Sequence, residues 1–99
     1  ANKEDHVSMG TIAARKCREV LKNAEFVISI ELLCAAQAMD LFTNLKAGAG
    51  TVEAYKLIRK HISHMEEDRI LSDDINTMYK LVHEGKIRDA VEKKIGTLN

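Results

Sequence analysis

The residues best suited to chemistry stand at the start of the chain, where NKEDHVSMG places Lys3, Glu4, Asp5 and His6 side by side. An apolar run with helical spacing follows at once. Two interpretations are open: a solvated segment with a helix cap, or the rim of an active site. Acids near a helix N-terminus are stabilising without any catalytic role. Composition and spacing alone therefore favour the cap.

A second set of candidates lies in HISHMEED, where His61, His64 and Glu67 follow one another at i, i+3 steps. On one helix face, imidazoles and a carboxylate could hold a metal ion. The spacing is not the HExxH of zinc proteases, and no fourth ligand is evident. Histidines suit the negative C-terminal end of a helix, which also explains His83. We therefore expect no metal site.

Two acids, Glu31 and Asp40, are the only charged residues between Phe26 and Phe42. A buried carboxylate must be paired, or its pKa rises. We expect a partner Arg, or the backbone of a neighbouring helix, to satisfy them.

Charge and composition exclude several classes of function. The 15 Lys and Arg balance the 15 Asp and Glu, so nothing marks a site for nucleic acid or an anionic membrane. Lys56, Arg59 and Lys60 are interpreted as one solvated helix face. The AGAG stretch lacks the Lys, Ser or Thr of a phosphate loop. No nucleic-acid or membrane partner is expected.

The two cysteines, Cys17 and Cys34, lie in helix-like runs without CxxC spacing. This usage indicates a reducing, cytoplasmic compartment. Cys17 has basic neighbours that could activate a thiol, but an ordinary helix residue is the preferred interpretation.

The elements that must position these residues are predicted to be helices. The 99 residues fit one domain or part of one, with no proline and 4% aromatic residues, a composition that favours helices over strands. We expect an all-α helical bundle fragment. It would comprise a strip at 1–7, a long helix at 8–43 and shorter helices at 51–63, 72–84 and 86–95. Ser8 and Thr51 are the expected N-caps, and a bend or break is expected near Asn23.

The second half of the long helix, FVISIELLCAAQAMDLF, is apolar nearly all round, which predicts burial on every side. It is short for a bilayer span and carries two charges, so a transmembrane interpretation is weak. Three short helices cannot cover it. The cover is expected from another part of a longer polypeptide or from other subunits.

Three stretches together resemble the C-terminal part of the histidine ammonia-lyase family, which is one of the aromatic amino acid lyases. NKEDHVSMG is similar to that family's NQEDHVSMG, IELLCAAQAMDL to its AIELLAAAQALDL, and EEDRILSDDI to its EEDR-x-L-x-x-DI. The resemblance runs from Asn2 to about Ile75, and residues 76–99 are generic helix. It implies an almost wholly helical homotetramer, built around a central bundle, that eliminates ammonia from L-histidine to give urocanate.

The resemblance also implies a prosthetic group. The family makes a methylidene-imidazolone from an internal Ala-Ser-Gly, and this chain contains no such tripeptide. We therefore expect the chain alone to be an inactive piece of an enzyme.

Glu4 matches the family's active-site glutamate, which implies a catalytic role and contact with substrate. A carboxylate can accept the imidazole N–H, whereas related phenylalanine and tyrosine lyases usually carry Gln there. Lys3 stands where the family most often has Gln, and is also expected beside the substrate. Its ammonium favours the ionised form of Glu4 and weakens a role as general base.

Three alternatives therefore stay open: an aminomutase, a lyase acting on another aromatic amino acid, and a stand-alone helical oligomerisation module.

Overall fold

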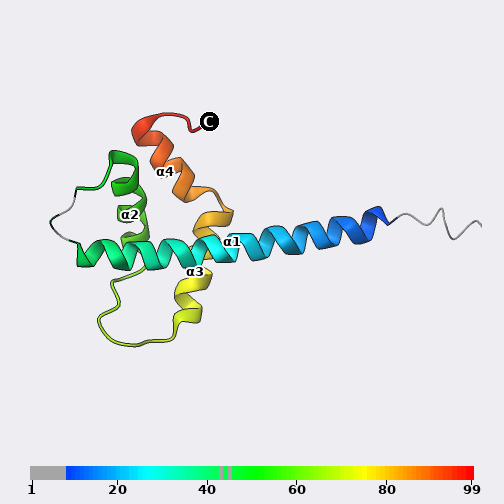
Figure 1. Cartoon of the computed structure of the whole chain (residues 1–99), viewed down its shortest axis with the longest axis horizontal. Coiled ribbons are helices and arrows are strands. Elements are labelled where there is room, and N and C mark those ends of the chain that lie inside the picture. Colours follow the sequence, from blue (N-terminus) through cyan, green and yellow to red (C-terminus); the bar gives the residue numbers. More distant parts are fainter. Residues whose placement is uncertain (1–8, 43, 45) are drawn as a thin grey trace, which may run out of the picture.

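The computed structural model describes residues 9–42, 44 and 46–99, which form four helices and no strand (Figure 1). The helices are α1 (Gly10–Leu41), α2 (Ala49–His61), α3 (Leu71–His83) and α4 (Lys86–Ile95). The predicted all-α fold class is confirmed. The expected strip at 1–7 and the Ser8 cap lie outside the described residues.

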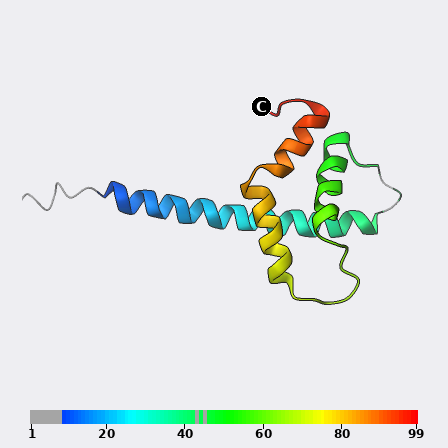
Figure 2. The same cartoon turned by 180° about the vertical axis from the view of Figure 1, so that it is seen from behind.

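Helix α1 is a single element of 32 residues. It runs through Asn23 without interruption, so the break expected there is wrong. Its interior holds neither proline nor glycine, and these are the residues that most often interrupt a helix. Its N-terminal half projects away from the other helices, which gather around its C-terminal half (Figures 1 and 2).

The start of α2 differs from the expected one. Gly48 is extended, and its carbonyl accepts a hydrogen bond from Val52 N–H at 3.0 Å. The helix therefore begins at Ala49, and Thr51 lies within its first turn rather than at the N-cap.

Helix α3 begins at Leu71 and carries Asp73 and Asp74 in its first turn, where a helix end favours negative charge. Gly85 follows its C-terminus with φ 72°, a left-handed conformation that glycine adopts without steric cost. The chain turns there directly into α4.

The apolar core is small and lies between α1, α2 and α3. Its buried members are Ala36, Ile58, Ile62, Met78 and Leu81. Helices α2 and α4 also approach closely, because Gly50 leaves space for α4. A Cβ atom at Gly50 would lie 3.1 Å from Val91 Cγ1 and 3.2 Å from Ile95 Cδ1.

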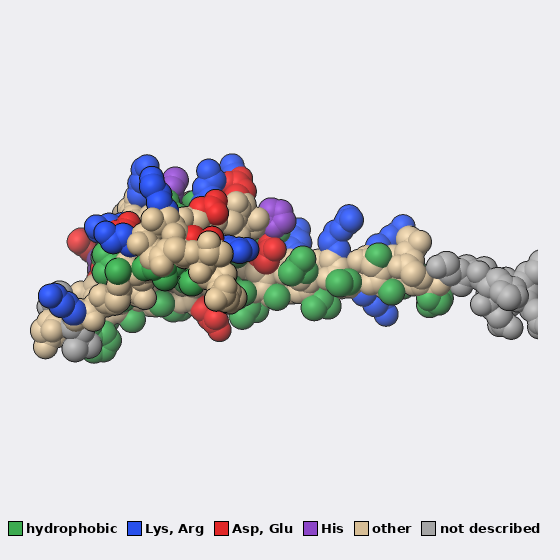
Figure 3. Space-filling view, turned by 90° about the horizontal axis from the view of Figure 1, so that it is seen from above, with side chains coloured by type: hydrophobic (Ala, Val, Ile, Leu, Met, Phe, Trp, Pro, Cys, Tyr) green, Lys and Arg blue, Asp and Glu red, His purple; other side chains and the backbone are tan. Residues whose placement is uncertain are grey.

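Much of α1 is not covered by this chain. Only Ser29 and Ala36 are buried along it, and Val27 is 56% exposed. Figure 3 shows hydrophobic side chains along α1 well beyond the cluster of the other helices. Helices α2 and α3 pack against one side of α1, so burial of 26–42 on every side would need cover from outside this chain, as the sequence predicts. In the described part of the chain, no helix combines the length and the hydropathy that a bilayer span requires.

Replacing Met78 with Ala should lower the free energy of unfolding by about 2–5 kcal/mol, because Met78 is fully enclosed at the centre of the core. Urea denaturation followed by circular dichroism measures the change. Ile70→Ala is the matched control, since Ile70 is 75% exposed, and should change the free energy by less than about 0.5 kcal/mol. Equal effects of the two substitutions would contradict this placement of the core.

Candidate functional site

The two residues that the sequence predicts for a substrate site, Lys3 and Glu4, lie outside the described residues. Their roles in catalysis and substrate binding therefore stay predictions.

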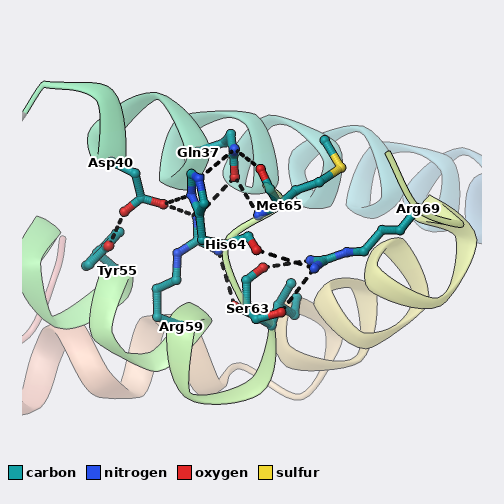
Figure 4. A network of polar contacts seen from close by, with 9 residues as sticks. Gln37, Asp40, Tyr55, Arg59, Ser63, His64, Met65 and Arg69 are labelled. Carbon is teal, nitrogen blue, oxygen red and sulfur yellow. Dashed lines mark hydrogen bonds and ion pairs between the residues drawn. The ribbon is translucent and has the colours of Figure 1, made fainter. Parts of the chain in front are cut away.

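The described residues instead form a polar cluster that joins α1, α2 and the connector at 62–70 (Figure 4). Its side chains are Gln37, Asp40, Tyr55, Arg59 and His64. The carboxylate of Asp40 lies at the centre, and its side chain is only 15% exposed. A charge so far withdrawn from water is stable only where donors surround it.

Three side chains meet the Asp40 carboxylate. The Tyr55 hydroxyl donates to Oδ1, Arg59 Nη2 donates to Oδ2 at 2.6 Å, and His64 Nδ1 lies 2.6 Å from Oδ2. The Tyr55 hydrogen bond is the largest cause that lowers the pKa of Asp40 to about 2, with His64 and Arg59 adding to it against the opposing effect of burial. The expected pairing of this acid with an arginine is confirmed.

Glu31 behaves differently from Asp40. It is exposed on α1, where water solvates its charge, so the expectation that a neighbouring helix satisfies it does not hold within this chain.

The sequence placed Arg59 on a solvated helix face. This is wrong for Arg59, because its side chain is only 17% exposed. Tyr55 and Arg59 stand one turn apart on α2, so both face α1. Arg59 Nη1 also donates to the Ile62 carbonyl at 3.2 Å, and its guanidinium lies 5.6 Å from the centre of the Tyr55 ring. Among the described residues, nothing accepts a hydrogen bond from the buried Nε. Lys56 and Lys60 are exposed.

Gln37 attaches the connector to α1. Its Nε2 donates to the Met65 carbonyl at 2.8 Å, and its Oε1 accepts from Met65 N–H at 3.2 Å. The ring Nε2 of His64 lies 3.5 Å from the side-chain Nε2 of Gln37. With its proton on Nδ1, the His64 ring donates a hydrogen bond to Asp40 and accepts one at Nε2 from Gln37.

Arg69 joins the two ends of the connector by hydrogen bonds. Its Nη2 donates to the Ser63 carbonyl at 2.6 Å, its Nη1 to Ser63 Oγ at 3.0 Å, and its Nε to Asp74 Oδ2 at 2.8 Å. Figure 4 shows Arg69 directed at Ser63. Through its bond to Asp74, the Arg of the EEDR motif links the connector to the first turn of α3.

A hollow of about 370 Å³ lies between α1, the connector and the start of α3. Its walls are mainly apolar, and Arg59, Arg69 and Asp74 reach it. These charged groups are already paired with one another or with Asp40. The carboxylate of Asp40 has its donors in place and a low pKa, so it is a poor proton acceptor near neutral pH. The cluster therefore holds the connector and α2 in position rather than performing a reaction.

The three described histidines do not converge on a metal site. His61 and Glu67 are exposed, while His64 belongs to the polar cluster. Across residues 9–42, 44 and 46–99, no three His, Cys, Asp or Glu side chains are grouped to hold a metal ion. His83 Nδ1 lies 2.8 Å from a Glu25 carboxylate oxygen, and its ring stacks on the Tyr79 ring. These contacts, besides its position at the C-terminal end of α3, explain a histidine there.

The sequence did not identify Gln37 and Tyr55 as members of the cluster. The available signal was the acid at Asp40 within an apolar run, together with a Tyr and an Arg spaced i, i+4 on a later helix.

Comparison with known proteins places the chain among aromatic amino acid lyases. Residues 1–60 match the model of the family described as aromatic amino acid lyase. The histidine ammonia-lyase of Natranaerobius thermophilus is 51% identical over 98 residues, which cover 99% of this chain and 19% of that protein. The histidine ammonia-lyase of Treponema denticola is 54% identical over 91 residues, covering 92% of this chain and 18% of that protein. No solved structure gives a significant match.

The chain thus spans about a fifth of the length of the curated relatives that it matches. The similarity extends past the family model into α3 and α4, because the alignment with the first of these relatives covers nearly the whole chain.

Replacing Tyr55 with Phe should raise the pKa of Asp40 toward its ordinary value of 3.8, because the largest cause of its lowering is removed. Carboxyl carbon chemical shifts followed through a pH titration measure it. Tyr79→Phe is the control, since the Tyr79 ring stacks on Phe26 and not on the cluster. An unchanged titration of Asp40 in the Tyr55 variant would contradict the assignment.

The low pKa of Asp40 also predicts how stability depends on pH. Its folded-state pKa lies below the unfolded value, so the stabilisation is complete above about pH 4 and is lost as the pH falls toward about 2. Asp40→Asn should remove this acid-sensitive part of the free energy of unfolding. Urea denaturation at about pH 6 and about pH 2 compares the two proteins. The control is Glu31→Gln, which removes an exposed acid in the middle of α1 and should keep the pH dependence of the parent.

Proposed function

Because the chain belongs to the aromatic amino acid lyase family, we propose that it is part of a histidine ammonia-lyase, which eliminates ammonia from L-histidine to give urocanate. The observation that carries this proposal is the identity of about half of all residues to proteins named histidine ammonia-lyase, along nearly the whole chain. The family model alone would fit the other aromatic substrates equally well.

This chain does not supply every part of that chemistry. It has no Ala-Ser-Gly, so its residues do not fit the formation of a methylidene-imidazolone group. We propose that a longer polypeptide provides this group and that the 99 residues alone are inactive. The chain's own contribution is then one substrate contact and a helical scaffold.

The proposed substrate contact is Glu4. A carboxylate accepts the N–H of an imidazole ring, and it stabilises a protonated ring more than an amide would. An acid at this position therefore favours histidine over phenylalanine or tyrosine. Lys3 stands beside it and would keep the carboxylate ionised.

The proposed scaffold is α1 with its polar cluster. The strip with Glu4 is followed directly by α1, so the position of this helix limits where the strip can lie. Groups that contact a substrate work best on rigid elements. The hydrogen bonds of Asp40 and Gln37 fix α2 and the connector to α1, which supports this role.

We also propose that the complete protein is a cytoplasmic homo-oligomer, a tetramer as the resemblance implies. The exposed apolar side chains along α1 support an assembly, because a large apolar surface is seldom left open to water.

Substituting Glu4 with Ala in the product of the complete gene should lower the turnover of L-histidine by about a hundredfold or more. The absorbance of urocanate measures it directly. Glu4→Gln tests whether charge matters, since it keeps the shape and loses the carboxylate. Glu67→Ala is the control, because Glu67 is exposed on the connector.

The same assay offers phenylalanine and tyrosine to each variant. If the parent protein leaves histidine unchanged but converts one of these, another aromatic amino acid is the substrate and Lys3→Gln becomes the next variant. If no aromatic amino acid is converted, the proposed function is wrong.

A further inference from the structure

The ring of His64 lies between a hydrogen-bond acceptor and a hydrogen-bond donor, both on α1 (Figure 4). Its Nδ1 is 2.6 Å from the carboxylate of Asp40, which only accepts hydrogen bonds. Its Nε2 is 3.5 Å from the side-chain Nε2 of Gln37, an amide nitrogen that only donates them. The neutral ring with its proton on Nδ1 satisfies both neighbours, because one ring nitrogen then donates and the other accepts.

The amide of Gln37 is held in one orientation by its other contacts. Its Oε1 accepts from Met65 N–H at 3.2 Å and from Arg59 Nη2 at 3.4 Å, and its Nε2 donates to the Met65 carbonyl at 2.8 Å. Exchanging the oxygen and the nitrogen would set donor against donor and acceptor against acceptor at these contacts. The nitrogen of Gln37 therefore stays directed toward His64, and it is a donor at every pH.

A second proton on the His64 ring would remove its acceptor. Nε2 would then carry a hydrogen that faces the amide hydrogens of Gln37, with no acceptor between them. The added positive charge would also share a carboxylate that already has a cation. Arg59 Nη2 lies 2.6 Å from the same oxygen of Asp40, and the Tyr55 hydroxyl donates to the other oxygen.

The remaining charged groups near His64 do not offset this second charge. Arg69 of the connector donates to the His64 carbonyl at 3.4 Å, is positive itself, and is paired with Asp74 of α3. Among the described residues, only Asp40 forms an ion pair with His64. The other acids of the connector are exposed, namely Glu66, Glu67 and Asp68.

His83 provides a contrast within the same chain. Its Nδ1 lies 2.8 Å from a carboxylate oxygen of Glu25, and its side chain is 62% exposed. No described donor forms a hydrogen bond with its Nε2. A second proton there strengthens the pair with Glu25, whereas a second proton on His64 opposes the contact with Gln37.

We propose that His64 is a proton-sensitive attachment of the connector at 62–70 to α1. The neutral ring joins the two elements, and uptake of a second proton breaks the contact with Gln37 and weakens the hydrogen bonds between Gln37 and Met65. The inference does not depend on the proposed reaction, because it concerns the contacts of the connector alone.

The surroundings of the ring allow such a change near neutral pH. The His64 side chain is 36% exposed, so solvent protons reach it. Histidine is the side chain that ordinarily changes its charge between about pH 5 and 8. The attached state requires the neutral ring, so the attachment is complete at the alkaline end of this range and weakens as the pH falls.

Loosening of the connector would change the hollow beside it. Ser63, Met65 and Arg69 belong to the connector and line the hollow, and Leu33 and Ala38 line it from α1. A detached connector would leave the α1 side of the hollow open to water. Acid would therefore act on this side of the fold first.

Amide hydrogen exchange of the 99-residue chain, followed by NMR, tests the attachment. Met65 N–H is the reporter, because its acceptor is the side chain of Gln37. After correction for the chemical exchange rate, its exchange should rise at least about threefold from about pH 7.5 to about pH 5.5. Asp40 keeps its charge over this range, since its pKa is about 2.

Two histidine variants separate the cluster from other effects of pH. His64→Asn keeps a donor toward Asp40 and takes up no proton in this range, so the exchange of Met65 N–H should become independent of pH. His61→Asn is the matched control, because it removes an exposed histidine one turn earlier. It should keep the pH dependence of the parent.

The nitrogen chemical shifts of the His64 ring report its tautomer without any substitution. At about pH 7.5 they should show the proton on Nδ1, and a proton on Nε2 instead overturns the inference. Equal corrected exchange of Met65 N–H at both pH values also overturns it, as does a pH dependence that persists in His64→Asn.

The complete gene product provides the same test within the longer polypeptide. Deuterium uptake of the peptide 62–70, measured by mass spectrometry and corrected in the same way, should be greater at about pH 5.5 than at about pH 7.5. Equal uptake contradicts the inference for the complete protein. None of these measurements uses the turnover of histidine, so failure here and failure of the proposed function are distinguishable.

Discussion

The withdrawal of the Asp40 carboxylate from water is the constraint on which the arrangement of α2 and the connector depends. Its donors come from residues 15, 19 and 24 positions away, so they can surround it only when α1, α2 and the connector pack together. The apolar core beside it is small, and apolar contacts are not directional. Hydrogen bonds to a charge are directional, so the cluster selects one relative position of these elements.

Two sides of helix α1 differ in what they contact. Its inner side, with Ser29 and Ala36, is buried by the other helices, and Gln37 and Asp40 extend that contact to the connector. Large apolar side chains elsewhere on α1, among them Val20, Leu21 and Val27, are exposed in this chain. A helix with two apolar sides belongs to a larger assembly than one small cluster of helices can provide. The family supports the same view, because this chain is about a fifth as long as its relatives.

Two kinds of observation support different parts of the proposed function. One is membership of the aromatic amino acid lyase family, and the other is the geometry of the described residues. The similarity to histidine ammonia-lyases supports the reaction, whose central group this chain does not encode. The geometry supports a scaffold, since every charged side chain drawn into the polar cluster is engaged in holding elements together. In the proposed enzyme the chain would contribute position and one substrate contact, and the proposed reactive group would come from another part of the polypeptide.

The sequence by itself determined the helical class, the family and the need of Asp40 for a partner. These follow from local propensity, from motifs that are contiguous in the chain and from the cost of burying a carboxylate. Only the tertiary structure decided that Tyr55, Arg59 and His64 are the partners, that Arg59 leaves the solvated face, and that α1 is covered on one side alone. Contacts of this kind join residues that are distant in the chain, so they depend on how the helices pack, and no local pattern in the sequence specifies that.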